Sequence, residues 1–129
     1  MSSTESPFYH GVYAATVCPM DEQGRYLDED ALAAHMHHIS RVEGIRGLLV
    51  NGHAGENFAL SLAEKKRVVE IARHVCPPET LLLAGINAED SFEGQLQADE
   101  AKAAGADVLL IFPPYSWTLS TDSETVINH

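Results

Sequence analysis

The chain has 129 residues, of which 45% are hydrophobic and 21% are charged, a balance typical of one globular domain with a single core. Its formal net charge of -11, with only 8 lysines and arginines, argues against a protein that binds nucleic acid or an anionic membrane. No apolar run approaches the length of a membrane span, and the first residues form no secretory leader, so the sequence predicts a cytoplasmic protein.

The first predicted element is a strand over residues 11–17, which ends at the pair Cys18-Pro19. We expect residues 1–8, ahead of this strand, to be disordered. Cys18 and Cys76 have no spacing typical of a metal site, and a cytoplasmic location disfavours disulfides. Both cysteines are therefore predicted to be free thiols.

A helix is predicted next, from the N-cap candidate Asp28 to about residue 42. The Asp28 carboxylate can accept a hydrogen bond from the first turn, and Gly44 can end the helix in a left-handed conformation. His35 and His38 share one face of this helix. Because no third ligand of fixed geometry accompanies them, we predict a solvated polar face and no metal site.

The most informative feature is an apolar run at residues 47–50 that stops abruptly in the segment Asn51-Gly52-His53-Ala54-Gly55-Glu56. A run without alternation predicts a strand buried on both faces, as in a parallel sheet covered by helices. Gly52 and Gly55 would allow backbone N–H groups to approach a ligand closely. This segment is therefore the candidate site.

The order of strand, loop and helix then recurs. Ser61 and Glu64 form a capping-box pattern ahead of an apolar helical stripe. A second buried run follows at residues 81–84, and Ser91 is the cap candidate for a helix that Gly105 ends. Each repeat is a βα unit whose ligand end lies at the carboxyl end of its strand.

The last predicted strand covers residues 106–112 and ends at Pro113-Pro114, since proline cannot donate to a ladder, and a further helix starts near Ser123.

Strand spacings of about 30 residues fit right-handed βαβ crossovers. Such runs form either an open doubly wound sheet or a closed barrel of roughly 250 residues. The chain is thus an open four-stranded domain or about half of a barrel. A flavodoxin-like sheet would also need a fifth strand or a glycine-rich first loop, and neither is visible.

A series of short motifs runs through nearly the whole chain in a specific order and spacing: Gly11-Val12, Cys18-Pro19-Met20, Gly52-His53-Ala54-Gly55-Glu56, Ala84-Gly85, Ala104-Gly105-Ala106-Asp107 and Pro113-Pro114-Tyr115. This series resembles the dihydrodipicolinate synthase and N-acetylneuraminate lyase family of pyruvate-dependent class I aldolases. Members of that family are α/β proteins, (β/α)8 TIM barrels that are usually tetrameric. The resemblance implies that residues 1–129 form the N-terminal half of such a barrel, its first four βα units.

In this family the loop after the second strand holds the carboxylate of pyruvate. The resemblance assigns substrate binding to Gly52, His53, Ala54 and Gly55, and a bracing role in the turn to Glu56. His53 and Ala54 stand where the family has hydroxyl residues, so backbone N–H groups remain as donors, and His53 could add a hydrogen bond or a positive charge. The alternative is that His53 is simply an exposed loop residue.

Tyr115 matches a catalytic tyrosine that, in several members, reaches a neighbouring subunit's site and takes part in proton relay. The alternative is that Tyr115 and Trp117 only pack at a subunit contact. The relay threonine of the family is replaced at Ala54. Cys18 also stands where the family has a threonine, and we expect an inert buried thiol there.

The family holds its keto substrate as a Schiff base on a lysine of the sixth strand, which lies outside this chain. Lys65, Lys66 and Lys102 are the lysines present, and all three are predicted on solvent-facing helix surfaces. A solvated amine keeps a high pKa and stays protonated at neutral pH. None of the three is therefore expected to form the imine.

Two functions are compatible with these observations. In the first, the chain is a fragment of a lyase or aldolase that acts on a small 2-keto acid such as pyruvate, needs no cofactor, forms a homo-oligomer when complete and is inactive alone. In the second, it is a non-enzymatic half-barrel remnant or an interaction module. The last predicted helix stops within its first turns, which favours a truncated chain.

Overall fold

Four parallel strands form one sheet in the order β1-β2-β3-β4. The computed structural model describes residues 9–119 and 122–128, so the disorder expected for residues 1–8 lies outside the described residues. The strands are β1 (Val12–Ala15), β2 (Ile45–Val50), β3 (Leu81–Ile86) and β4 (Val108–Ile111). All four predicted strands are confirmed, with bounds that differ from the expected ones by a few residues.

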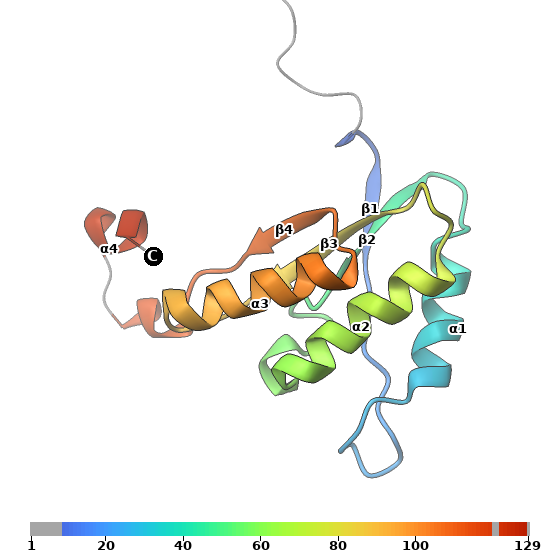
Figure 1. Ribbon diagram of the computed structural model, residues 1–129, viewed down its shortest axis with the longest axis horizontal. Helices are drawn as coiled ribbons and strands as arrows, with labels where there is room; N and C mark the ends of the chain where they lie inside the picture. The colour runs from blue at the N-terminus through green and yellow to red at the C-terminus, as the bar shows by residue number, and fades with distance from the viewer. Residues whose placement is uncertain (1–8, 120–121, 129) are drawn as a thin grey trace, which may run out of the picture.

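Helices connect these strands on one side of the sheet (Figure 1). The helices are α1 (Glu29–Ile39), α2 (Leu62–Val75), α3 (Ser91–Ala104) and the short α4 (Ser123–Asn128), with 3₁₀ turns η2 (Asn57–Ala59) and η3 (Tyr115–Thr118). A doubly wound sheet would reverse its strand order and carry helices on both faces. Sequential strand order with helices on one side is the arrangement of a (β/α) barrel, and this chain forms a part of such a barrel.

Local capping explains where the helices begin. The Asp28 side chain accepts from the Ala31 N–H at 3.0 Å, as predicted for α1. Ser61 and Glu64 form the predicted capping box, with both reciprocal hydrogen bonds present. The prediction that Ser91 caps α3 is wrong, because the Asp90 side chain accepts from the third helical amide and Ser91 is the first helical residue.

The first helix is shorter than predicted. α1 ends at Ile39, with Ser40 as the C-cap, and not near residue 42. The N–H of Val42 bonds to the carbonyl of Ile39, so the chain turns before Gly44, which adopts φ 90°. Gly44 therefore ends the turn that follows the helix, and the left-handed conformation expected there is present.

The core lies between the sheet and helices α1 to α3. Leu48 and Val50 of β2 are fully buried, whereas Leu49, whose side chain points to the opposite face, is only half-buried. The expectation that this strand is buried on both faces is wrong, because the helices cover one face alone. The core side chains with at most 2% exposure are Leu32, Met36, Leu48, Val50, Val68, Val69, Ala72, Leu82 and Ala84.

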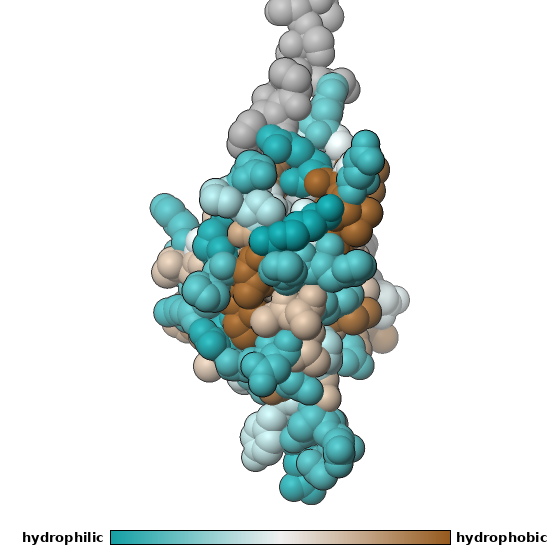
Figure 2. Space-filling view, turned by 90° about the vertical axis from the view of Figure 1, so that its right-hand side faces the viewer, coloured by the Kyte–Doolittle hydropathy of each residue, from teal (hydrophilic) through white to brown (hydrophobic). Residues whose placement is uncertain are grey.

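Both edges of the sheet carry exposed apolar side chains. Val12 of β1 is 60% exposed and Ile111 of β4 is 65% exposed. Figure 2 shows apolar patches between the hydrophilic side chains on one side of the molecule. Within the described residues, β1 and β4 each pair with one strand only and form the two edges of the sheet.

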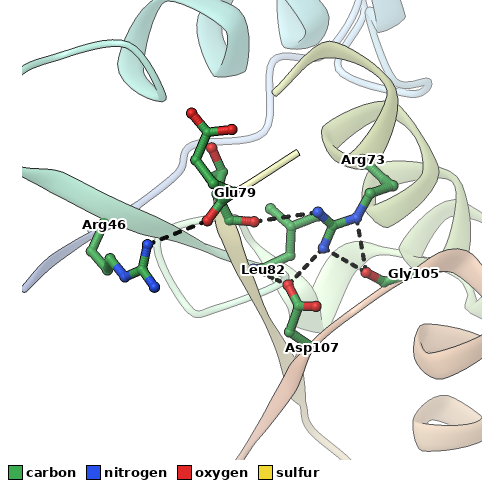
Figure 3. A network of polar contacts seen from close by, with 7 residues as sticks. Arg46, Arg73, Glu79, Leu82, Gly105 and Asp107 are labelled. Atoms are coloured by element: carbon green, nitrogen blue, oxygen red, sulfur yellow. Dashed lines mark hydrogen bonds and ion pairs between the residues drawn. The ribbon is translucent and has the colours of Figure 1, made fainter. Parts of the chain in front are cut away.

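A guanidinium clamp holds the amino ends of β3 and β4 together (Figure 3). Arg73 of α2 donates to the Gly105 carbonyl at 2.8 and 3.1 Å, to the Thr80 carbonyl at 3.3 Å and to the Asp107 carboxylate at 2.6 Å. The same carboxylate accepts from the main-chain N–H of Leu82 at 2.9 Å. Asp107 and Arg73 thus join one helix to two strands.

We predict that Asp107→Ala lowers the free energy of unfolding by about 1–3 kcal/mol, because the Leu82 N–H and the Arg73 guanidinium both lose an acceptor. Urea unfolding at pH 7, followed by far-UV circular dichroism, measures the change. Glu100→Ala is the matched control: it breaks the Lys66–Glu100 pair on the surface, and such pairs contribute little. Equal decreases in the free energy of unfolding in the two variants would contradict the stabilising role of the clamp.

Candidate functional site

A tight turn follows β2 at the carboxyl edge of the sheet. Asn51 and Glu56 both have φ 55°, a left-handed conformation that reverses the chain at each end of the turn. The Gly52 carbonyl accepts from the N–H groups of Gly55 and Asn57, and the N–H of Glu56 bonds to the carbonyl of His53. Among the described residues, the amides of Gly52, His53 and Ala54 donate no main-chain hydrogen bond.

The two loop glycines lie in closely packed surroundings. A Cβ at Gly52 would approach the Leu49 side chain to 3.2 Å, and one at Gly55 would approach the Thr16 carbonyl to 3.2 Å. Both glycines are buried, and the Gly55 amide is consumed within the turn. The two glycines therefore let the loop pack closely, and the role in ligand binding expected of them stays a prediction.

The loop is fastened to the following helix by Asn51. Its side-chain amide donates to the Lys65 carbonyl in the first turn of α2 at 2.9 Å, and the residue is only 3% exposed. The Glu56 side chain, by contrast, is exposed, and Glu56 contributes to the turn through its main chain. In this structure the bracing expected of the Glu56 side chain comes from main-chain hydrogen bonds and from Asn51.

His53 lies against two aromatic residues from the end of β4. Its ring centroid is 4.1 Å from that of Phe112, with a 53° angle between the planes, and 5.8 Å from that of Tyr115. The Tyr115 hydroxyl is 3.4 Å from His53 Nδ1. The structure therefore brings His53 and Tyr115 together, although 62 residues separate them in the sequence. Ala54 is exposed and offers only its main chain.

The lysines do not all have the surroundings expected from the sequence. Lys65 is half-buried, and burial lowers the pKa of its ammonium while the charge of Glu93 acts in the opposite direction. It lines an open hollow of about 440 Å³ together with Glu93 and Tyr115. Lys66 pairs with Glu100, and Lys102 is exposed. The prediction of three fully solvated lysines is thus wrong for Lys65, because the loop and α3 shield it.

The two cysteines are free and buried, as predicted. Burial, with smaller contributions from the charges of Glu56 and Glu64, raises the pKa of the Cys18 thiol to about 11. Burial also raises the pKa of the Cys76 thiol. A thiol that stays protonated is a poor nucleophile, so the inert role expected for Cys18 is consistent with its surroundings.

The described part of the chain contains no group of three or more His, Cys, Asp or Glu side chains placed to hold a metal ion. His35, which the sequence placed on a solvated face, is half-buried, and its Nε2 atom is shielded from solvent. Within the described residues, no helix has the length and apolar character needed to cross a membrane.

Parallel strands with helices on one side, and a polar loop at their carboxyl edge, define a partial (β/α) barrel with its candidate site where barrel enzymes carry theirs. Comparisons with known proteins agree with this class. The profile of the Dihydrodipicolinate synthetase family matches residues 8–128. The chain belongs to this family.

Two similar curated proteins are 4-hydroxy-tetrahydrodipicolinate synthases. The one from Acidiphilium cryptum is 38% identical and the one from Agrobacterium fabrum 36% identical, each over 83% of this chain and 36% of the relative. A crystal structure of dihydrodipicolinate synthase from Aquifex aeolicus superposes with a TM-score of 0.74 at 28% identity, over 83% of this chain and 36% of that one. The chain therefore spans little more than a third of the length of these relatives.

Sequence reasoning missed two residues of the site. Phe112 was expected only as the last residue of a strand, yet its ring supports His53. Glu89 was not singled out at all, yet its carboxylate accepts from the main chain at Tyr115 and Ser116. The sequence shows only that Glu89 is an acidic residue shortly after a predicted strand, and this position does not reveal which groups its carboxylate contacts.

We predict that Cys18, studied alone in a Cys76→Ala variant, reacts slowly with a thiol-specific disulfide reagent at pH 8 and rapidly once the chain is unfolded in urea. Burial raises the pKa of the folded thiol to about 11, so Cys18 stays protonated and unreactive at pH 8. The protonated thiol favours the folded state fully below pH 9, and this stabilisation is lost as the pH rises toward 11. Absorbance of the released thiolate follows the reaction. Equal reaction rates of Cys18 in the folded and unfolded chains at pH 8 would contradict the burial of its thiol.

Proposed function

We propose that this chain supplies the substrate-carboxylate site of a lyase or aldolase that acts on a small 2-keto acid such as pyruvate. The observation that supports the proposal is the pair of amides at His53 and Ala54, which donate no main-chain hydrogen bond among the described residues and lie in a loop that Asn51 fastens to α2 at the carboxyl edge. Two N–H groups directed at one carboxylate form charge-assisted hydrogen bonds. A fixed loop also lowers the entropy cost of binding.

The proposed chemistry assigns the acid–base role to Tyr115, whose phenol lies within reach of the same loop. The imine-forming lysine belongs, in this proposal, to the part of the barrel outside residues 1–129. Lys66 and Lys102 lie on helices, where Lys66 pairs with Glu100 and Lys102 is exposed to solvent. Lys65 is shielded but sits in the first turn of α2 and not on a strand. The cytoplasmic location and homo-oligomeric assembly expected from the sequence belong to the same proposal.

The second candidate, a half-barrel that acts as an interaction module, is favoured by the exposed apolar side chains of β1 and β4. The two functions differ in whether the loop has affinity for a keto acid. A binding experiment on the chain therefore separates them.

We predict that titration of the ¹⁵N-labelled chain with pyruvate shifts the amide signals of residues 52–54, whereas acetone, which has the ketone and no carboxylate, leaves them in place. Ala54→Pro removes one N–H donor and should weaken pyruvate binding about 10- to 100-fold, since a hydrogen bond to a charged group contributes about 1.5–3 kcal/mol. Ala54→Gly keeps the donor and is the matched control. Unchanged affinity in the proline variant would remove the loop from the carboxylate site.

We also predict that borohydride treatment with pyruvate leaves the mass of the isolated chain unchanged, because no lysine within it is placed to form the imine. Intact-mass spectrometry provides the measurement, and a complete homologous synthase treated in parallel is the positive control. A stable adduct on Lys65, Lys66 or Lys102 would show that the electrophile-forming amine lies inside this chain.

A further inference from the structure

We propose that the pair Asn51-Gly52 is a modification site, at which the side chain of Asn51 loses ammonia and becomes aspartate or isoaspartate once the loop opens. The folded loop holds this reaction back, and the reaction in turn releases the loop from α2. The inference does not depend on the function proposed for the loop, because neither step involves a keto acid.

The reaction needs an asparagine that is followed by an unshielded main-chain nitrogen. The nitrogen of Gly52 gives up its proton and attacks Cγ of Asn51, so that a new C–N bond closes a succinimide ring. The Cγ–Nδ2 bond breaks, and the departing nitrogen takes up a proton and leaves as ammonia. Water then adds to either ring carbonyl and reopens the ring, which gives aspartate or isoaspartate. Water is the only co-reactant, and no oxidant or reductant takes part.

Sequence and main-chain hydrogen bonding single out this position. Among the four asparagines, Asn51 alone precedes a glycine, the residue that has no Cβ to obstruct the attack. The other three precede Phe58, Ala88 and His129. Among the described residues, the Gly52 N–H donates no main-chain hydrogen bond, so no such bond holds the attacking nitrogen in place.

The fold opposes the reaction at both the side chain and the main chain of Asn51. The residue is only 3% exposed, and its Nδ2 atom, the leaving nitrogen, donates to the Lys65 carbonyl at 2.9 Å. The Asn51 carbonyl packs so closely against Gly85 that a Cβ there would overlap it. Closing the succinimide ring would turn this carbonyl out of its place, and the packing resists that rotation. The reaction therefore requires the loop to lift off α2 and the sheet edge.

The product cannot restore the contact that the asparagine makes. Aspartate puts an oxygen acceptor in the place of the Nδ2 donor, opposite the Lys65 carbonyl. The other side-chain atom, Oδ1, is buried and has no partner among the described residues. A carboxylate at this position is thus a buried charge that faces an acceptor, which is strongly unfavourable. Isoaspartate in addition lengthens the main chain by a methylene group within a closed turn. Conversion therefore unfastens the loop and prevents its return.

The first test compares the unchanged chain at pH 8 in buffer and in urea, with peptide mass spectrometry to follow the conversion of each asparagine. We expect Asn51 to convert about 10-fold faster or more in urea, because the folded chain reacts only through local opening. Asn57 and Asn87 are internal controls and should convert slowly in both conditions. Equal rates for Asn51 in the two conditions would refute the protection by the fold. An Asn51 that converts no faster than Asn57 and Asn87 in urea would refute the site.

Gly52→Ala tests the chemistry in urea, where the packing of the loop plays no part. The added Cβ shields the attacking nitrogen, so the conversion of Asn51 should slow by about 10-fold or more. An unchanged rate would exclude attack by the nitrogen of residue 52.

Asn51→Asp is the stable equivalent of one product and tests the consequence of conversion. The N–H groups of Gly55 and Glu56, which bond within the turn, should exchange with deuterium faster than in the unchanged chain, while the amide spectrum of the sheet stays dispersed. Asn51→Ala removes the donor without adding a charge and should also speed the exchange. Gln23→Glu makes the same amide-to-acid change at an exposed position and is the control. Unchanged exchange in both Asn51 variants would overturn the claim that conversion releases the loop.

Discussion

The close approach of β2 and β3 at their carboxyl ends is the constraint on which the candidate site depends. Gly85 of β3 lies directly against the carbonyl of Asn51, and a Cβ at that position would overlap this carbonyl and approach the Phe112 ring to 3.0 Å. Only glycine permits this contact. The chain can therefore leave β2 with a left-handed Asn51 and fold back over the sheet edge, where the Asn51 amide fastens it to α2.

This packing decides what the loop can contact. Once the turn lies over the ends of β2 and β3, its third residue, His53, reaches the end of β4 and meets Phe112 and Tyr115. A hydroxyl side chain at residue 53 would be too short to pack against Phe112 in the same way. Aromatic packing of His53 against Phe112 and Tyr115 thus joins the loop after β2 to the end of β4.

The two ends of the sheet have different roles. At the amino ends of β3 and β4, Arg73 and Asp107 join α2 to both strands through hydrogen bonds to main-chain groups, an arrangement that stabilises the fold. At the carboxyl ends, the loop after β2 carries the amides of His53 and Ala54, which donate no main-chain hydrogen bond among the described residues, and His53 contacts Tyr115. Barrel enzymes separate stability and chemistry in this same way, which explains why the clamp contains no candidate site residue.

The sequence by itself determined the four βα units and, to within a few residues, their boundaries, because buried apolar runs, the Ser61–Glu64 capping box and the glycine at residue 105 act over a few residues. It also located the candidate loop and Tyr115. Only the tertiary structure decided that the helices cover one face, that Lys65 is shielded, and that Glu89 and Phe112 complete the site. The contact of Glu89 with Tyr115 joins residues 26 positions apart, and that of His53 with Tyr115 joins residues 62 positions apart. Contacts between such distant residues depend on how the strands lie side by side, which no local sequence pattern encodes.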